Sequence, residues 1–204
     1  MFGSQFKEAI TNSATFPEDD PKYFDILMSW VYHGQLPRLL ITLQEGLYSF
    51  DWSPIYLYAL ADKFGVYEVM DRGIDQITKF LNTSGHLPNA SSYGKVYSLT
   101  PEGSPLRRLY SQLIVYGLMK HSRLLSIDGG CEGLAESYPD LARDVVSVLL
   151  AANGSFENPC SNSQTCRFHI RKLSGPDTSY FCVMGPGKLL FHELQDDTDF
   201  VIIC

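Results

Sequence analysis

The apolar positions at the start of the chain recur with the period of an α-helix. They predict a short amphipathic helix over residues 2–10, with Phe2, Phe6, Ala9 and Ile10 on one face. A second helix begins after Asp20, a capping residue, and ends at Gly34. Its apolar residues fall at i, i+3, i+4 and i+7 and predict one continuous buried stripe, made of Phe24, Leu27, Met28 and Val31.

Two further helices follow a predicted loop over residues 35–52, in which residues 39–43 form a short apolar piece. Ser53 is positioned to cap the first of them, Pro54 suits its first turn, and Gly65 ends it. The second helix keeps the same apolar period over residues 66–81. Two helices joined by a single glycine are expected to pack as an angled pair.

The middle of the chain alternates polar loops with helices. Residues 82–94 read as a loop, and a helix opens at Ser104 and Pro105. Residues 122–133 are rich in glycine and predict a linker. Ser137 is then placed to cap a last helix that runs to about residue 152.

The pattern changes after residue 153, where Ser, Asn, Pro and Gly become frequent. Short apolar runs at 180–184, 189–191 and 200–203 predict strands, with a hairpin turn at 185–187. The expected fold class is therefore mainly α, with a small β-rich C-terminal tail over residues 154–204.

Charge narrows the choice of partners. The 204 residues include 23 acidic and 16 basic side chains, for a net charge of -7. An acidic chain without basic clusters argues against sequence-independent binding to nucleic acid or to anionic membranes. No apolar run reaches the roughly 18 to 20 residues of a membrane span, and the N-terminus lacks the pattern of a secretory signal. The odd number of cysteines, 5, fits reduced thiols, so we expect a cytoplasmic or nuclear protein.

One group of residues has the chemistry of a zinc site. Thiolates and an imidazole suit tetrahedral zinc, and a small β tail would gain stability from a structural ion. The candidate ligands are Cys160, Cys166, His169 and Cys182. The spacing between the first two is wider than usual, so the sequence favours ordinary unpaired thiols and no metal, with zinc as the alternative.

Catalytic chemistry has little support in the sequence. Cys131 lies in a glycine-rich turn and could act as a nucleophile, with His121 or His169 as the base. Nothing in the sequence pairs these residues, and no paired carboxylates or phosphate-binding glycine loop are present. We therefore expect a protein that is not an enzyme and has no cofactor. A zinc- or thiol-dependent enzyme that uses the C-terminal Cys and His residues is the competing hypothesis.

Several phrases resemble the fungal BTB/POZ proteins, a family of interaction domains. In order they are FKEA at 6–9, FPEDDP at 16–21 followed by Phe24, WVYHGQL at 30–36, LYALADKF at 57–64 and ID at 74–75. Further phrases resemble the helical extension of the fungal members: VY at 96–97 with Thr100, SPLR at 104–107, and the helix that opens at Pro139. The resemblance runs from Phe6 to about Ala152.

The resemblance implies a partial BTB/POZ-like domain over residues 1–82 and a helical extension over 83–153. It also implies a non-catalytic protein-protein interaction module that forms homo- or hetero-oligomers. Such a module would recruit partners as a ubiquitin-ligase adaptor or a regulatory scaffold. In related adaptors a hydrophobic-x-Glu element docks on a cullin-type scaffold, and Phe6 and Glu8 match it in form. The ordinary alternative is a core phenylalanine and a solvated glutamate.

The resemblance departs from the family at its start. A complete domain of this kind carries a β-hairpin and a helical hairpin ahead of the segment that opens here. Without them the first helices would expose core faces, at a loss on the order of 10 kcal/mol, which is comparable to the net stability of a domain. We expect that another chain covers these faces, that the domain is marginal, or that the sequence is a truncated gene product without independent function.

Overall fold

The protein is mainly helical over the residues that the structure describes. The computed structural model describes residues 16, 19–44, 47–120, 130–152, 156–161, 165–170 and 200–203. Within them lie α2 (Pro21–His33), β1 (Leu39–Gln44), β2 (Leu47–Phe50), α3 (Pro54–Lys63), α4 (Tyr67–Ser84), α5 (Ala90–Leu99), α6 (Pro105–Lys120), α7 (Gly130–Ser137), α8 (Pro139–Ala151) and β3 (Phe200–Ile203). A short 3-10 turn covers Cys166–Phe168. The mainly α character expected from the sequence is confirmed.

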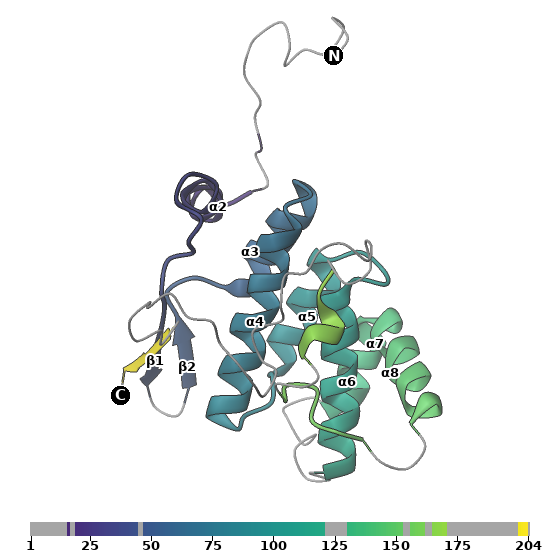
Figure 1. Cartoon of the computed structure of the whole chain (residues 1–204). Coiled ribbons are helices and arrows are strands. Elements are labelled where there is room, and N and C mark those ends of the chain that lie inside the picture. The colour runs from purple at the N-terminus through teal and green to yellow at the C-terminus, as the bar shows by residue number, and fades with distance from the viewer. Residues whose placement is uncertain are drawn as a thin grey trace, which may run out of the picture.

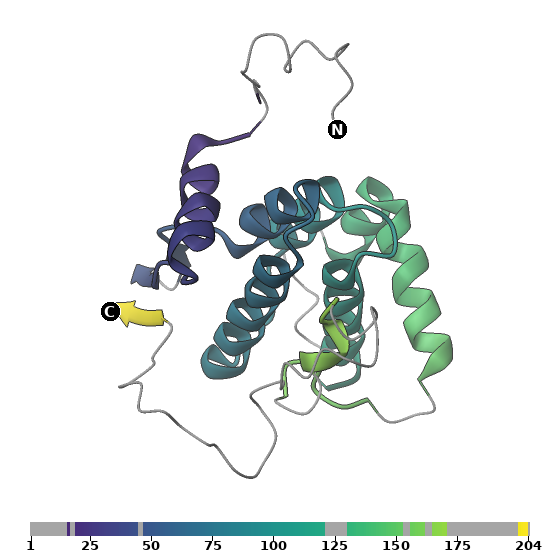
Figure 2. The same ribbon diagram turned by 45° about the horizontal axis from the view of Figure 1, so that its top comes forward.

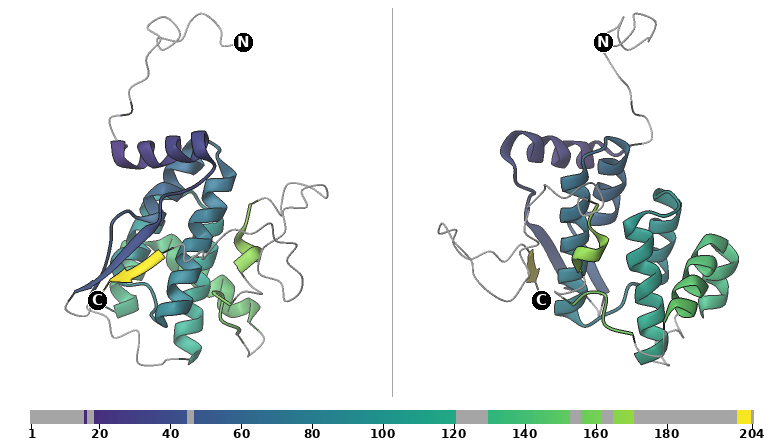
Figure 3. Two further views of the ribbon diagram at one scale, coloured as in Figure 1. Left: turned by 60° about the vertical axis from the view of Figure 1, so that its left-hand side comes forward. Right: turned by 45° about the vertical axis from the view of Figure 1, so that its right-hand side comes forward.

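The elements are arranged around α3, α4 and α6 (Figure 1). The three strands lie on the side of α4 that is opposite to α6, and α7 and α8 pack beyond α6 (Figures 1 and 2). Helix α2 lies across one end of the molecule, away from α7 and α8 (Figure 3). None of the helices within the described ranges is both long and apolar enough to cross a membrane.

Helix α2 begins and ends where its capping residues predict. The Asp20 side chain accepts a hydrogen bond from the Lys22 backbone N–H at 2.9 Å, and Pro21 occupies the first turn. Gly34 ends the helix with φ 69°, a left-handed conformation that favours glycine, and its N–H bonds to the Trp30 carbonyl. The capping residues therefore predicted both ends of this helix correctly, and the prediction is confirmed.

The loop predicted over residues 35–52 is wrong for residues 39–44 and 47–50, which form two paired strands. β1 pairs antiparallel with β2, from Ile41 opposite Phe50 to Gln44 opposite Leu47. Alternate residues of β1, Leu39 and Ile41, are completely buried, as expected for a strand with one face on the core. The sequence analysis noted the apolar piece at 39–43 but assigned it to a loop, and it did not identify β2.

The final apolar run forms β3, which confirms the predicted strand at 200–203. β3 pairs with β1 in parallel, with Leu39 opposite Phe200, so the sheet has the order β2-β1-β3. This strand therefore joins the sheet of the N-terminal hairpin. The strands predicted at 180–184 and 189–191 lie outside the described residues.

Three details after α4 differ from the sequence prediction. The predicted loop at 82–94 contains the start of α5, which Asn89 caps by accepting from the Ser92 backbone N–H at 2.9 Å. The predicted linker at 122–133 ends in α7, which begins at Gly130. Finally, α8 begins at Pro139 with Tyr138 at the capping position, so the cap predicted at Ser137 is wrong. The starts of α5 and α7 lie in polar or glycine-rich stretches, which are typical of loops.

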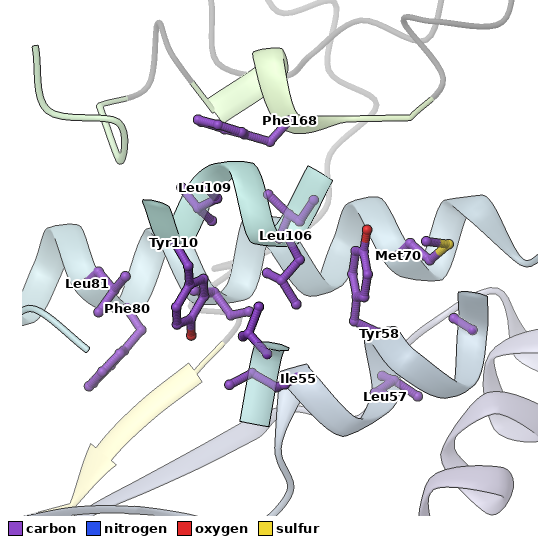
Figure 4. Close-up of a cluster of buried hydrophobic side chains, with 14 of the residues drawn as sticks. Ile55, Leu57, Tyr58, Met70, Phe80, Leu81, Leu106, Leu109, Tyr110 and Phe168 are labelled. Carbon is purple, nitrogen blue, oxygen red and sulfur yellow. The ribbon is translucent and has the colours of Figure 1, made fainter. Parts of the chain in front are cut away.

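One hydrophobic core joins these elements (Figure 4). Many of its fully buried side chains come from α3, α4 and α6, such as Leu57, Met70 and Leu106, and β1 and α5 add Leu39, Ile41 and Val96. Phe168, from the 3-10 turn after α8, belongs to the same core. The Tyr58 hydroxyl and the Ser104 hydroxyl are 3.1 Å apart and connect α3 to the start of α6.

Candidate protein-interaction surface

Among the described residues, helix α2 is covered on one side only. Ile26 and Leu27 are its buried residues, and among the described helices it packs mainly on α3. Tyr23 fixes its position: the Tyr23 ring stacks on Tyr56 at 5.4 Å between centroids, and the Ser53 backbone N–H donates to its hydroxyl at 3.2 Å. Burial raises the pKa of Tyr23, which therefore stays a neutral hydroxyl at physiological pH.

The predicted buried stripe of α2 is wrong at two of its four positions. Leu27 is buried and Met28 is half-buried, but Phe24 is 38% exposed and Val31 is 53% exposed. Tyr32, one turn beyond Met28, is 76% exposed. The apolar side of this helix is wider than the face that α3 covers, so a second apolar strip remains in solvent.

An aromatic cluster continues this strip at the end of α3. The Phe64 ring lies 5.4 Å from the Phe16 ring and 6.1 Å from the Phe24 ring, both in edge-on arrangements. All three rings are more than one-third exposed. Lys63 lies 5.2 Å from the Phe16 ring centroid and forms an ion pair of 2.6 Å with Asp19. We call Phe16, Phe24, Val31, Tyr32 and Phe64 the α2 surface.

The α2 surface combines residue types that are enriched in protein interfaces. Aromatic side chains supply much of the binding energy there, and contiguous exposed apolar patches often mark interaction sites. Exposed apolar side chains also occur on α8, where Val146, Leu149 and Leu150 follow helical spacing. The α8 strip lacks aromatic residues, which makes the α2 surface the stronger candidate.

The residues proposed to dock on a cullin-type scaffold, Phe6 and Glu8, lie outside the described residues. The two nearest described residues of their region are Phe16 and Asp19, which both take part in the cluster at the end of α3. The docking role of Phe6 and Glu8 therefore stays a prediction.

The described zinc candidates do not form a metal site together. Cys160 is buried and free, and burial raises the pKa of its thiol from 9.0 to about 12, so it is not a thiolate at neutral pH. The His169 Nε2 atom lies 2.9 Å from Asp75 Oδ1 and is occupied by that contact. Cys182 lies outside the described residues, as does the side chain of Cys166. Within the described part of the chain no three His, Cys, Asp or Glu side chains are placed to hold a metal ion.

The described residues give no support to the hypothesis of a thiol-dependent enzyme. His121 is outside the described residues, and of Cys131 only the backbone, in α7, is described. His169, the other proposed base, pairs with Asp75 of α4. The residues named for a nucleophile and its base are thus not brought together in the described part of the molecule.

The phrases that resemble the helical extension meet around one buried arginine. The Arg107 guanidinium donates to the carbonyl of Tyr97 at 2.7 Å and to the carbonyl of Thr100 at the end of α5. Its charged carbon lies 4.8 Å from the Tyr97 ring centroid, and one nitrogen lies 3.5 Å from Asp140 of α8. The Tyr97 hydroxyl donates to Asp144 at 2.7 Å. These residues hold α5, α6 and α8 together, so the phrases contribute to the packing of these helices.

Sequence reasoning missed both the buried Arg107 network and the exposed α2 surface. A charged residue inside an apolar helix pattern, as at Arg107, is a signal that could have pointed to the network. No feature of the sequence predicts the exposure of Val31 and Tyr32, because an apolar residue on a helix is expected in the core until its neighbours are known. Comparison with protein-family models, with curated proteins and with solved structures finds no match to this chain.

Proposed function

We propose that this protein is a non-catalytic protein-protein interaction module with a BTB/POZ-like architecture, and that the α2 surface is where it binds another polypeptide. The observation that carries the proposal is the exposed apolar strip on a helix whose other side is firmly anchored. A rigid helix with exposed aromatic anchors loses little conformational entropy on binding. This makes it a suitable docking face for a helix or an extended segment of a partner.

The resemblance to fungal BTB/POZ proteins extends the proposal to the type of assembly. The order of the matching phrases supports a BTB-like half, which ends with α4, followed by a helical extension. The module would form homo- or hetero-oligomers and recruit partners as a ubiquitin-ligase adaptor or regulatory scaffold, with Phe6 and Glu8 contributing to a cullin-type contact. The acidic net charge of -7 favours protein partners over nucleic acid.

The proposed location is the cytoplasm or the nucleus. The odd number of cysteines, 5, supports this, because an extracellular protein of this size would normally pair its thiols. Cys160 adds to the argument, since it is a free thiol packed inside the core. A reducing compartment keeps such a thiol intact.

Paired substitutions test the role of the α2 surface. We expect the double variant Val31→Ser/Tyr32→Ser to weaken self-association, or binding to a cullin N-terminal domain, by about thirtyfold, the effect of a 2 kcal/mol hot spot. Its melting temperature should hardly change, because both side chains are exposed. The matched control is Val146→Ser/Leu150→Ser, which removes exposed apolar side chains from α8. Sedimentation velocity over a wide concentration series measures the association of the two double variants.

Two results would contradict the proposal. One is a wild-type chain that stays monomeric throughout the series and does not bind the cullin domain. The other is an equal loss of association in the α2 and α8 variants, which would indicate non-specific stickiness and not a defined surface.

A further inference from the structure

The chain returns to the helical core after α8. Residues 156–161 and 165–170 pack against the core, and Cys160, Thr165 and Phe168 are each at most 3% exposed. The Phe168 ring faces Leu106 and Leu109 of α6 (Figure 4), and the 3-10 turn that carries it contacts the same helix. We call residues 165–170 the return segment.

Two carboxylates of α4 recognise the end of the return segment. Asp71 accepts a hydrogen bond from the backbone N–H of Ile170 at 2.8 Å, and Asp75 contacts the His169 ring at 2.9 Å. The two acids are four residues apart and therefore lie on the same side of the helix. Asp71 and Asp75 of α4, with Leu106 and Leu109 of α6, form what we call the seat. The seat contacts an aromatic residue, a histidine and a backbone N–H, in that order along the return segment.

The seat is formed by two helices of the core, whereas the return segment does not fold by itself. Helices α4 and α6 contribute many of the buried residues of the core. The return segment has a single 3-10 turn, and so short a piece has no stable structure alone. Its order therefore comes from the seat, as for a bound peptide.

Asp71 contributes a buried hydrogen-bond acceptor to the seat. Its side chain is only 6% exposed, and a buried carboxylate without a donor is costly. The Ile170 N–H is one of the groups that satisfy this carboxylate. A peptide backbone is thus the natural occupant of this position.

We infer that the face formed by α4 and α6 is a peptide-binding site, and that the return segment is its exchangeable built-in ligand. The site takes a segment of the type aromatic–His–aliphatic, here Phe168, His169 and Ile170. The same segment supplied by a separate molecule competes with the attached one. This site is distinct from the α2 surface, and its existence does not depend on the proposed function.

Peptide binding to a vacated chain tests the inference. The full chain with Phe168→Ala and His169→Ala keeps its connectivity but loses the two side chains that fill the seat. A fluorescein-labelled peptide of residues 156–172 should bind it roughly tenfold or more tightly than it binds the wild-type chain, where the attached segment competes. Fluorescence anisotropy gives both affinities, under reducing conditions.

Two controls assign the binding to the seat. Adding Asp75→Asn to the vacated chain should weaken peptide binding, because the histidine loses its carboxylate. Adding Asp25→Asn, the same change on exposed α2, should not. A folded vacated chain that binds no peptide, or that binds it no better than the wild type does, would overturn the inference.

Hydrogen exchange on the wild-type chain gives an independent answer if the vacated chain does not fold. An exchangeable segment opens locally, so the Ile170 amide should exchange by a route that is nearly independent of denaturant. Exchange of Ile170 only through global unfolding, with the same denaturant dependence as the α6 amides, would show an integral part of the core and would overturn the inference.

Discussion

Arg107 illustrates how one buried charge can organise several helices. Its guanidinium neutralises the carbonyl end of α5 while facing Asp140 of α8, and Tyr97 covers it with its ring. Cations favour the C-terminal end of a helix, where carbonyl groups lack partners. The arginine is therefore satisfied in place, although 7% exposure would be costly for an unpaired charge.

Replacing this arginine should destabilise the protein strongly. Arg107→Met keeps the aliphatic volume but leaves the Tyr97 and Thr100 carbonyls without their charged donor. We expect a loss of about 3 kcal/mol in the free energy of unfolding, the scale of a buried hydrogen bond to a charged group. Urea denaturation measures the change.

Arg143→Met is the matched control for that variant. Arg143 forms ion pairs with Glu102 and Asp140, but its side chain is 61% exposed. The expected loss is below about 1 kcal/mol, because exposed ion pairs contribute little. Similar losses in the two variants would contradict the role assigned to Arg107.

Cys160 makes stability depend on alkaline pH. The folded protein holds the proton of this thiol up to a pKa of about 12, whereas the unfolded chain releases it near 9.0. Between these values the unfolded state binds fewer protons, so the free energy of unfolding should fall as pH rises, by about 1.4 kcal/mol per pH unit for one group. Tyr58, whose pKa burial raises from 10.0 to about 12, adds to the slope at the upper end.

The variant Cys160→Ala isolates the thiol. Its unfolding free energy should fall less steeply above pH 9 than that of the wild type, whatever the difference between the two at neutral pH. Thermal or urea unfolding at several alkaline pH values gives the slopes. Identical slopes would mean that the thiol does not stay protonated in the folded protein.

At the scale of elements, two glycines inside helices have opposite surroundings. A Cβ atom at Gly94 of α5 would lie 2.8 Å from the Tyr138 hydroxyl and 3.2 Å from the ring carbon that bears it. A Cβ at Gly133 of α7 would meet none of the described residues within 4 Å. The first glycine permits α5 to approach the start of α8, and the second has no such role.

Alanine substitution should therefore act in opposite directions. Gly94→Ala is expected to cost about 1 to 3 kcal/mol through overpacking. Gly133→Ala is expected to stabilise by up to about 1 kcal/mol, because alanine favours the helix. Adding Tyr138→Phe to Gly94→Ala should restore part of the loss, since it removes the closest atom. Equal effects at the two glycines, measured by denaturation, would contradict the close packing of α5 on Tyr138.

The sequence was most informative about elements with local signals. Asp20, Pro21 and Gly34 define the ends of α2 because caps act within a few residues. The apolar period likewise located α4 and α6, whose stripe residues are almost all buried. These predictions need no knowledge of the rest of the molecule.

Elements that depend on distant partners were missed. β2 is a short strand whose pairing with β1 decides its structure, and Asp51 helps to close the hairpin by accepting from the Leu40 backbone N–H at 2.9 Å. α5 contains Ser91, Ser92 and Gly94, which read as a loop until the packing of Gly94 on Tyr138 is known. In both cases tertiary contacts outweigh local propensity.

At the scale of the whole molecule, the candidate site follows from what α2 lacks. The sequence predicted core positions at Phe24 and Val31, and the described elements leave both partly exposed. An apolar stripe reports that a face needs a partner, but it cannot report whether the partner lies in the same part of the chain. The site could therefore be located only once α3 was seen to cover one side of the helix.

Segments that are far apart in the sequence also meet at this scale. β3 pairs with β1 although about 160 residues separate them, a distance along the chain across which no local pattern acts. The return segment reaches back in the same way to α4. The composition changes near residue 153, but residues on either side of this point are in contact with each other.

Site-specific photo-crosslinking tests the central claim, that the α2 surface binds another polypeptide, most directly. A photoreactive phenylalanine analogue at Tyr32, 76% exposed, would report contacts of α2, and the same analogue at Leu150, 82% exposed, controls for exposure alone. We predict discrete adducts of higher mass from position 32, absent at position 150. Products confined to crosslinks within the chain, or the same adducts from both positions, would contradict the claim.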